Sequence, residues 1–260
     1  MSTATPTRRS PDGRTWHQKL IVEERYVSPA IRRRLILVAA SLIVVGAVCF
    51  TVLLIGVLTH EGLSELDRSV ELWINTQRSA PDTAVAISLA IAFGPIALPI
   101  IVFLVIAIWF LTARHFWRPI MLVAGMLLGL IVALVVPSVV ERPRPPIRLM
   151  LFGPDPSFGF PSGHVLGTAD FLLLTAFLIA SRKTNPWWAI IGFAIAAVGI
   201  AAQIVSRIYL GYHWLTDTLA SVSLSLIVLG IVIAVDTWRT VRVPGEPITG
   251  EYSKLQTDGT

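Results

Sequence analysis

The sequence predicts an all-α, polytopic membrane protein with six transmembrane helices and both termini in the cytoplasm. Hydrophobic residues make up 54% of the 260 residues and charged residues only 14%, and the mean hydropathy is +0.73. Soluble domains carry about a quarter charged residues, so this composition favours a membrane protein. Six long apolar runs and a one-sided distribution of basic residues lead to the same prediction.

The apolar runs have the length of transmembrane helices, which need about 20 apolar residues. They are Leu35–Thr59, Thr83–Thr112, Pro119–Val140, Val165–Ala180, Pro186–Val205 and Leu215–Val235. Only Asp170 and Asp217 interrupt the fourth and sixth runs. We expect helices because lipid offers no water to the backbone N–H and C=O groups. Gly94, Pro95 and Pro99 predict a bend in the second run.

The basic residues predict the orientation. With the N-terminus in the cytoplasm, 15 of the 21 Lys and Arg residues lie on the inner side and 6 on the outer side, as the positive-inside rule requires. We therefore expect a multi-pass protein of the plasma (cytoplasmic) membrane. Basic residues that cluster at the ends of apolar runs also argue against a nucleic-acid partner, despite a net charge of +5. The single cysteine, Cys49, excludes an intramolecular disulfide.

The chain divides into three parts by composition. Residues 1–34 are polar and basic and predict a largely disordered cytoplasmic tail, with at most a short surface helix near Trp16–Val27. Residues 35–238 form the six-helix membrane domain, and residues 239–260 form a second cytoplasmic tail. No small-x-small cleavage site follows the first apolar run, so a cleaved signal peptide is not expected.

Between the first two runs, apolar residues recur at intervals of three or four. They are Leu63, Leu66, Val70 and Trp73. This spacing predicts a helix that lies flat at the outer membrane interface and shields whatever lies beneath it.

Three polar segments, far apart in the sequence, fall on the outer side of this topology. They are Glu141–Pro146, Phe160–His164 and Ser206–Asp217. Four of the six outer basic residues lie in or beside these segments, namely Arg142, Arg144, Arg148 and Arg207. These arginines depart from the positive-inside rule, which places basic residues on the cytoplasmic side. Binding of an anionic ligand is the simplest explanation for them. The planar fork of Arg matches phosphate oxygens.

The residue types in these segments suit phosphoryl transfer. Ser162 and Gly163 open a helix, where free backbone N–H groups favour an anion. His164 follows at once and can supply a proton. His213 and Asp217 are four residues apart and share a helix face. A carboxylate beside an imidazole fixes its tautomer, which leaves the other ring nitrogen as a nucleophile.

This set resembles the type 2 phosphatidic acid phosphatase superfamily of lipid phosphate phosphatases, which also includes vanadium haloperoxidases. The family pattern is Lys, six residues, Arg-Pro; then Pro-Ser-Gly-His; then Ser-Arg, five residues, His, three residues, Asp. The second part is complete at Pro161, Ser162, Gly163 and His164, and the third is complete at Ser206, Arg207, His213 and Asp217. In the first part Arg144-Pro145 matches, but Pro137 stands where the family has Lys.

The resemblance implies metal-independent hydrolysis of a lipid phosphate or diphosphate through a phosphohistidine, at the outer face and without a cofactor. His213 would attack phosphorus, oriented by Asp217, while His164 protonates the leaving group. The phosphate ligands implied are Arg144, Ser162, Gly163 and Arg207, with Arg142 as a candidate to compensate for the missing Lys. Substrate candidates are a polyprenyl diphosphate, phosphatidate and phosphatidylglycerol phosphate.

Two other functions remain open at this point. A phosphotransferase would pass the phosphate from His213 to a lipid or a sugar instead of water. A non-catalytic lipid-phosphate binder or transporter would explain the loss of Lys at Pro137. Against a binder, both histidines and Asp217 are present, and binding alone needs no nucleophile. A transporter should carry charges near mid-membrane, where only Asp170 lies.

Asp170 is the one acid placed well inside a predicted span. It lies six positions after His164, about 9 Å along a helix. Intramembrane acids are costly and usually paired. We therefore expect Asp170 to bond a neighbouring helix or to orient a group of the site. The oligomeric state has no signature in the sequence.

Overall fold

The computed structural model describes residues 16–250 and 252–256. Its α-helices are α1 (Trp16–Lys19), α2 (Pro29–Thr59), α3 (Leu66–Thr76), α4 (Ala80–Ala92), α5 (Ala97–Thr112), α6 (Trp117–Val140), α7 (Gly163–Ala180), α8 (Trp187–Tyr209) and α9 (Leu215–Thr240). Short 3₁₀ turns are η1 (Gly62–Glu65) and η2 (Ile147–Leu149), and the strands are β1 (Val22–Tyr26), β2 (Val241–Arg242) and β3 (Ser253–Leu255).

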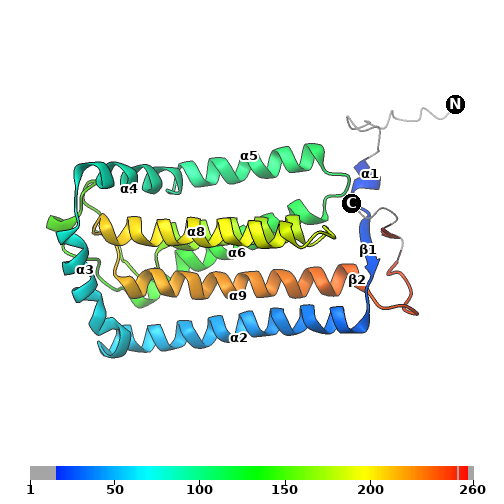
Figure 1. Ribbon diagram of the computed structural model, residues 1–260, viewed down its shortest axis with the longest axis horizontal. Coiled ribbons are helices and arrows are strands. Elements are labelled where there is room, and N and C mark those ends of the chain that lie inside the picture. The colour runs from blue at the N-terminus through cyan, green and yellow to red at the C-terminus, as the bar shows by residue number, and fades with distance from the viewer. Residues whose placement is uncertain (1–15, 251, 257–260) are drawn as a thin grey trace.

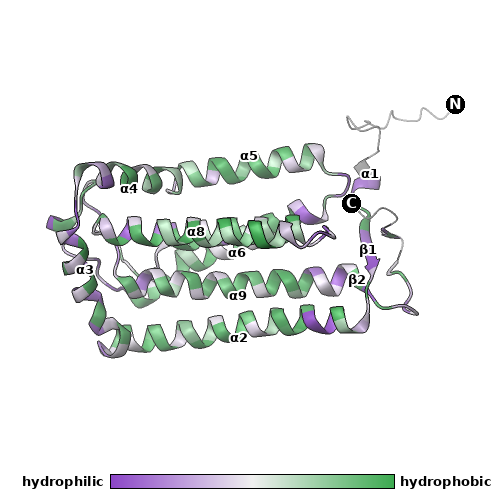
Figure 2. Ribbon diagram, in the orientation of Figure 1, coloured by the Kyte–Doolittle hydropathy of each residue, from purple (hydrophilic) through white to green (hydrophobic). Residues whose placement is uncertain are grey.

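The long helices run side by side along the long axis of the molecule, and α3 crosses one end while β1 crosses the other (Figure 1). Five of them are long and apolar enough to span a membrane, and the bent pair α4 and α5 brings the number of candidate spans to six when it is counted as one broken span. Each predicted apolar run lies in one of these six spans. Figure 2 shows apolar residues along the helices and polar residues gathered at both ends, which is the pattern expected for a bundle embedded in lipid.

The predicted bend in the second run is confirmed. Helices α4 and α5 meet at 51° across the break between Ala92 and Ala97. Pro95 lies in this break and has no N–H to continue the helical ladder. The break places Gly94 close to the beginning of α7, because a Cβ added at Gly94 would lie 3.6 Å from Nε2 of His164.

Helices α7 and α9 form the centre of the bundle and carry most of its buried residues. Leu174 and Leu178 of α7 pack with Leu122 of α6 and with apolar residues of α9. Small residues bring α9 against α2, since a Cβ at Gly46 would meet the Ser223 carbonyl oxygen at 2.6 Å. Without a hydrophobic driving force between helices in lipid, such close backbone packing holds a bundle together.

The helix predicted between the first two spans is α3. Its buried face holds Asp67, Glu71 and Ile74, whereas Leu66 and Trp73 of the apolar stripe are exposed. Val70, also of the stripe, packs against the cluster that includes Ile74. The stripe is therefore partly exposed, and the adjoining face of α3 covers the end of the bundle.

The expectation of a largely disordered N-terminal tail did not include the strand that residues 22–26 form. β1 lies at the centre of a small parallel sheet of order β2-β1-β3, so the two tails pair with each other. The buried carboxylate of Glu24 accepts from Arg239 and Arg242 at 2.8 Å each. The surface helix expected near Trp16–Val27 is limited to the single turn α1. Residues 1–15 and 257–260 lie outside the described residues.

Candidate active site

The three polar segments meet at the end of the bundle that α3 crosses. They are the connection from α6 to α7, the first turn of α7, and the turn between α8 and α9 (Figure 1). The sequence places these segments far apart, and the antiparallel course of α6 to α9 brings them together. Gly211 adopts φ +77° in the α8–α9 turn, a left-handed conformation that glycine takes without strain.

His213 is buried, and its surroundings fix its tautomer. Nδ1 lies 2.9 Å from the Gly159 carbonyl oxygen, so this nitrogen carries the proton and donates it. Nε2 lies 2.8 Å from Nη1 of Arg144 and accepts its N–H. Burial lowers the pKa of His213 well below 6.5, and the charges of Arg144 and Arg207 lower it further. The ring is therefore neutral, with its lone pair on Nε2.

Asp217 lies beside His213, but its hydrogen bonds go elsewhere. Its Oδ2 is 3.6 Å from Nδ1 of His213 and accepts the Trp214 N–H at 2.9 Å. Its Oδ1 accepts from Arg142 at 2.5 Å. The group within hydrogen-bonding distance of Nδ1 is thus the Gly159 carbonyl. The Asp217 carboxylate is near enough to stabilise a positive ring that forms during a reaction.

Arg142 is held between two acids. Besides Asp217, its guanidinium donates to Oδ2 of Asp67 at 2.6 Å and to the Thr216 hydroxyl at 2.7 Å. Asp67 also accepts the Thr216 N–H at 2.9 Å. Through these three bonds Arg142 positions Asp217 and holds α3 over the site, and they occupy three of its five N–H donors.

Arg144 reaches His213 from the other side. Its Nη1 donates to the Tyr212 carbonyl at 2.8 Å as well as to the ring, and its Nη2 lies 3.2 Å from Asp155. Burial lowers the pKa of Arg144, an effect that Asp155 and Asp217 oppose. A half-buried guanidinium bound to Nε2 of His213 is well placed for a phosphate oxygen.

Arg207 is the residue whose placement calls most clearly for a ligand. It is 3% exposed, and its Nε is buried without a hydrogen-bond partner. Its guanidinium lies 4.4 Å from the centroid of the Tyr212 ring and forms no ion pair with a described residue. A buried cation without a counter-ion is costly, and an anion would relieve that cost.

The first turn of α7 completes the site. Ser162 is the N-cap and is fully buried, and its hydroxyl accepts weakly from the Val165 N–H at 3.5 Å. Gly163 is exposed, and a Cβ added there would meet nothing within 4 Å. His164 makes no side-chain hydrogen bond with a described residue, and Arg207, His213 and Arg144 are close enough for their charges to act on its ring.

Four contributors were not identified from the sequence: Asp67, Asp155, Ser157 and the Gly159 carbonyl. Asp155 and Ser157 hold Arg144, with the Ser157 hydroxyl 3.1 Å from Nη2. The sequence does contain a signal for Asp67. It follows Leu63 by four residues and precedes Val70 by three, so an acid lies at helical spacing among the apolar residues of the stripe. A backbone carbonyl such as that of Gly159 leaves no signal in residue types.

No lysine replaces the one that the family pattern has at Pro137. Pro137 is half-buried near the end of α6. Lys19, Lys183 and Lys254 lie in α1, in the α7–α8 loop and in β3, at the opposite end of the bundle (Figure 1). Arg148 lies exposed in η2.

An apolar groove of about 590 Å³ leads from His164 along the bundle between α5, α6 and α7. Its walls include Leu127, Leu130 and Leu134, which are exposed on the outer surface of the bundle. Asp170 lines its far part, directly over Gly129, where a Cβ would collide with the carboxylate. Neither carboxylate oxygen of Asp170 has a hydrogen-bond partner within 3.5 Å among the described residues, and the Ser225 hydroxyl of the neighbouring helix α9 is the side chain that acts on it.

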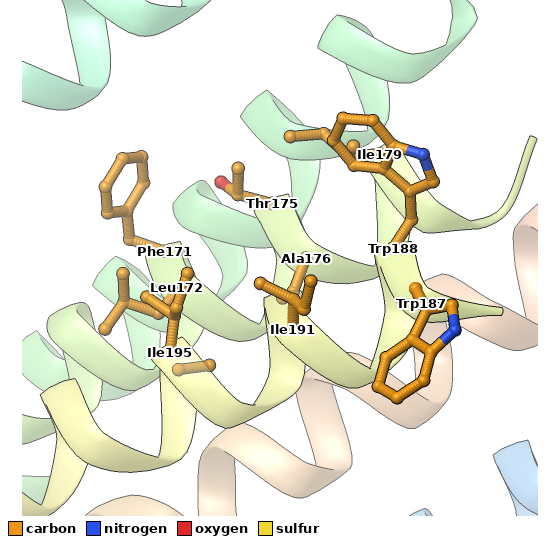
Figure 3. A pocket seen from close by; sticks show the side chains of 11 residues that line it. Phe171, Leu172, Thr175, Ala176, Ile179, Trp187, Trp188, Ile191 and Ile195 are labelled. Carbon is orange, nitrogen blue, oxygen red and sulfur yellow. The ribbon is translucent and has the colours of Figure 1, made fainter. Parts of the chain in front are cut away.

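A second apolar hollow, of about 430 Å³, lies between α7 and α8 with Trp187 and Trp188 at one end (Figure 3). No titratable side chain is among the residues that line it, so these residues provide no acid, base or activated nucleophile for catalysis. Among the described residues, no group of three or more His, Cys, Asp or Glu side chains is arranged to hold a metal ion.

Known proteins share both the sequence pattern and the fold. Over 103 residues the chain is 32% identical to phosphatidylglycerophosphatase B of Bacillus subtilis (strain 168), covering 37% of this chain and 47% of that protein. Over 92 residues it is 33% identical to phosphatidylglycerophosphatase B of Escherichia coli (strain K12), covering 35% and 32%. The chain thus matches less than half the length of these relatives.

The fold is that of a solved membrane phosphatase. The crystal structure of a transmembrane PAP2 type phosphatidylglycerolphosphate phosphatase from Bacillus subtilis superposes with a TM-score of 0.65 at 21% identity. The match covers 74% of this chain and 96% of that one. The sequence model of the PAP2 superfamily matches residues 118–240, which contain both complete motifs. This segment of the chain is therefore similar to the PAP2 superfamily.

Proposed function

We propose that this protein hydrolyses a lipid phosphate monoester or diphosphate through a phosphohistidine on His213. The observation that carries the proposal is the geometry of the buried His213 ring: Nδ1 lies 2.9 Å from the Gly159 carbonyl oxygen, and Nε2 lies 2.8 Å from Arg144. Arg207, whose charge also acts on this ring, has no carboxylate partner among the described residues. Such an arrangement suits a nucleophile that must approach an anion.

The phosphate would take the place that Arg207, Arg144 and the Gly163 N–H surround. Arg144 now donates to Nε2 of His213. When a phosphate oxygen accepts that N–H instead, the lone pair becomes free to attack phosphorus. Ser162 supports this cradle as the N-cap that holds the first turn of α7 in place. The end of a helix adds its own attraction for an anion.

The reaction then proceeds in two displacements. Nε2 forms a bond to phosphorus while the bond to the lipid oxygen breaks, and His164 gives its proton to that oxygen. The carboxylate of Asp217, 3.6 Å from Nδ1, offsets the positive charge on the phosphorylated ring. Water next attacks phosphorus and gives a proton back to His164, which releases inorganic phosphate and restores both histidines.

The apolar groove favours a lipid as the substrate. It begins at His164 and opens on the face of the bundle formed by exposed apolar residues. A lipid tail can lie there while its head group reaches the arginines. The relatives named phosphatidylglycerophosphatase B support a glycerophospholipid phosphate as the first compound to assay.

Phosphate release from a panel of lipid phosphates and diphosphates by the purified protein tests this function, with EDTA present and with His213→Ala as the control. We expect release that EDTA leaves unchanged and that the variant loses. Equal release by His213→Ala would remove the nucleophile assignment, and loss with EDTA would remove the metal-independent mechanism. Transfer of phosphate to a lipid or sugar without inorganic phosphate would point to the phosphotransferase instead.

A further inference from the structure

A polar cavity lies at the end of the bundle opposite the candidate active site. It has a volume of about 330 Å³ and is enclosed by the end of α5, the beginning of α6, the α7–α8 loop and β1. Figure 1 shows β1 and the end of α5 far from α3, which covers the other end. None of the catalytic candidates lines this cavity.

The lining of the cavity is strongly positive. Arg114, Arg118, Arg182 and Lys183 line it, and Glu23 is the one acid among the described lining residues. Glu23 is itself engaged by His115 at 2.9 Å and by Lys254 at 3.5 Å. Basic side chains therefore outnumber acidic ones in the described lining of the cavity.

Arg182 carries an unused donor in this cavity. Its side chain is 7% exposed, its Nη2 lies 3.1 Å from Asp236, and its Nη1 is buried without a hydrogen-bond partner. Asp236 also accepts from the Trp117 indole at 2.8 Å. Burial and the charge of Arg182 lower the pKa of neighbouring Arg25 to about 10. A buried N–H of a charged group that lacks a partner is costly, so a ligand is expected.

Two further cations remain available to such a ligand. The ring contacts of Arg118 and Lys183, at 5.9 Å to Trp109 and 5.5 Å to Trp188, involve no acid. The beginning of α6 also lines the cavity with Trp117 and Arg118. This helix has no side-chain N-cap bond and no acid in its first turn, so an anion in the cavity would meet the positive end of its dipole.

Orientation in the membrane does not require this arrangement. The positive-inside rule needs basic residues on one side of the membrane, and the exposed Arg33 and Arg34 of α2 serve that purpose at the same end. The positive-inside rule does not explain why Arg182 is buried with an unpaired N–H donor in a cavity that other basic residues line.

We propose that this cavity is a second anion site, which binds a phosphate group at the face opposite the candidate active site. The phosphate belongs either to the head group of an anionic phospholipid or to free inorganic phosphate, since the Arg fork and a helix N-terminus recognise both. The inference does not depend on the proposed catalytic function, because the two sites share no residue.

Thermal unfolding of the full-length protein in nanodiscs tests the site. One arm titrates inorganic phosphate into discs of phosphatidylcholine, and the other replaces part of that lipid by phosphatidylglycerol without free phosphate. The variant Arg118→Gln/Lys183→Gln is compared with the matched Arg33→Gln/Arg34→Gln, which loses the same charge outside the cavity. The candidate active site is unchanged in all these proteins, so its share of any phosphate effect is common to them.

We expect phosphate, phosphatidylglycerol or both to raise the Tm of the wild type and of Arg33→Gln/Arg34→Gln. In Arg118→Gln/Lys183→Gln the response should need about tenfold more ligand or disappear. A response only to the lipid identifies a head-group site, and a response only to phosphate identifies a soluble ligand. Equal responses of the two double variants in both arms would overturn the proposal. If the cavity variant does not fold, Lys183→Gln against Arg34→Gln gives the same comparison, since both residues are exposed.

Discussion

Arg207 shows at the scale of one residue how stability and function oppose each other. Its guanidinium is 3% exposed and has no carboxylate partner among the described residues. Burying this charge without a counter-ion lowers the stability of the folded protein. A bound anion would restore that stability. Residues that serve binding in this way often lower stability in the free protein.

We predict that Arg207→Met raises the Tm in the absence of phosphate while kcat/KM falls by about 100-fold or more. The methionine fills similar space without a charge. Thermal unfolding and phosphate release on the same preparations measure both quantities, with the exposed Arg68→Met as the control. A lower Tm together with unchanged kcat/KM would contradict this role.

His213 makes the stability depend on pH. Burial, then Arg144 and Arg207, hold its folded-state pKa well below 6.5, whereas the unfolded chain titrates near 6.5. Between these two values the unfolded state binds more protons, so stability falls as the pH falls. The slope contributed by one proton is at most about 1.4 kcal/mol per pH unit.

Unfolding of the wild type and of His213→Asn between pH 7 and pH 5 measures this contribution. We predict that the wild type loses more stability than the variant, while His60→Asn, an exposed histidine, behaves like the wild type. The same acid sensitivity in His213→Asn would show that its ring is not held neutral by the fold.

At the scale of elements, α3 is the cover of the site. It contributes Asp67, which binds both Arg142 and the first turn of α9. Arg142 in turn holds Asp217 beside His213. A buried network of charged groups thus links α3 to the catalytic candidates. Removing one partner from such a network strongly destabilises the folded protein.

We predict that Asp67→Ala destabilises the protein by about 3–5 kcal/mol and lowers kcat more than it raises KM, because Asp217 loses its support. Asp67→Asn should recover part of both losses. The exposed Glu61→Ala is the control for charge. Wild-type stability and kcat in Asp67→Ala would show that α3 does not position the site.

Elements differ in how far sequence alone predicts them. Apolar length predicted all six spans, and Gly94 with Pro95 predicted the break between α4 and α5, because both signals are local. β1 was missed because its partners lie more than 200 residues away, where Tyr26 pairs with Arg242. The motif residues of the site were found, but the Gly159 carbonyl that orients His213 is a backbone group and has no signature.

At the scale of the whole molecule, the bundle separates two polar ends. The candidate active site lies at one end, and the paired tails and the second cavity lie at the other (Figures 1 and 2). The distribution of basic residues leads us to propose that the tails face the cytoplasm and that the active site faces outward.

Single cysteines in a Cys49→Ala background test this orientation in intact cells with a membrane-impermeant maleimide. We predict that Arg148→Cys, exposed beside the candidate site, is labelled at once, and that Thr184→Cys, exposed in the α7–α8 loop, is labelled only after permeabilisation. The reverse pattern would place the active site in the cytoplasm.

The most direct test of the central claim is isolation of the phosphoenzyme. Rapid acid-free quenching after mixing with a substrate labelled in its phosphate should trap an alkali-stable, acid-labile label, because a phosphorus–nitrogen bond has those properties. The account predicts that this label maps to His213 and is absent in His213→Ala, while His164→Ala slows its formation and its decay. Turnover without any labelled enzyme, or a label on another residue, would contradict the account.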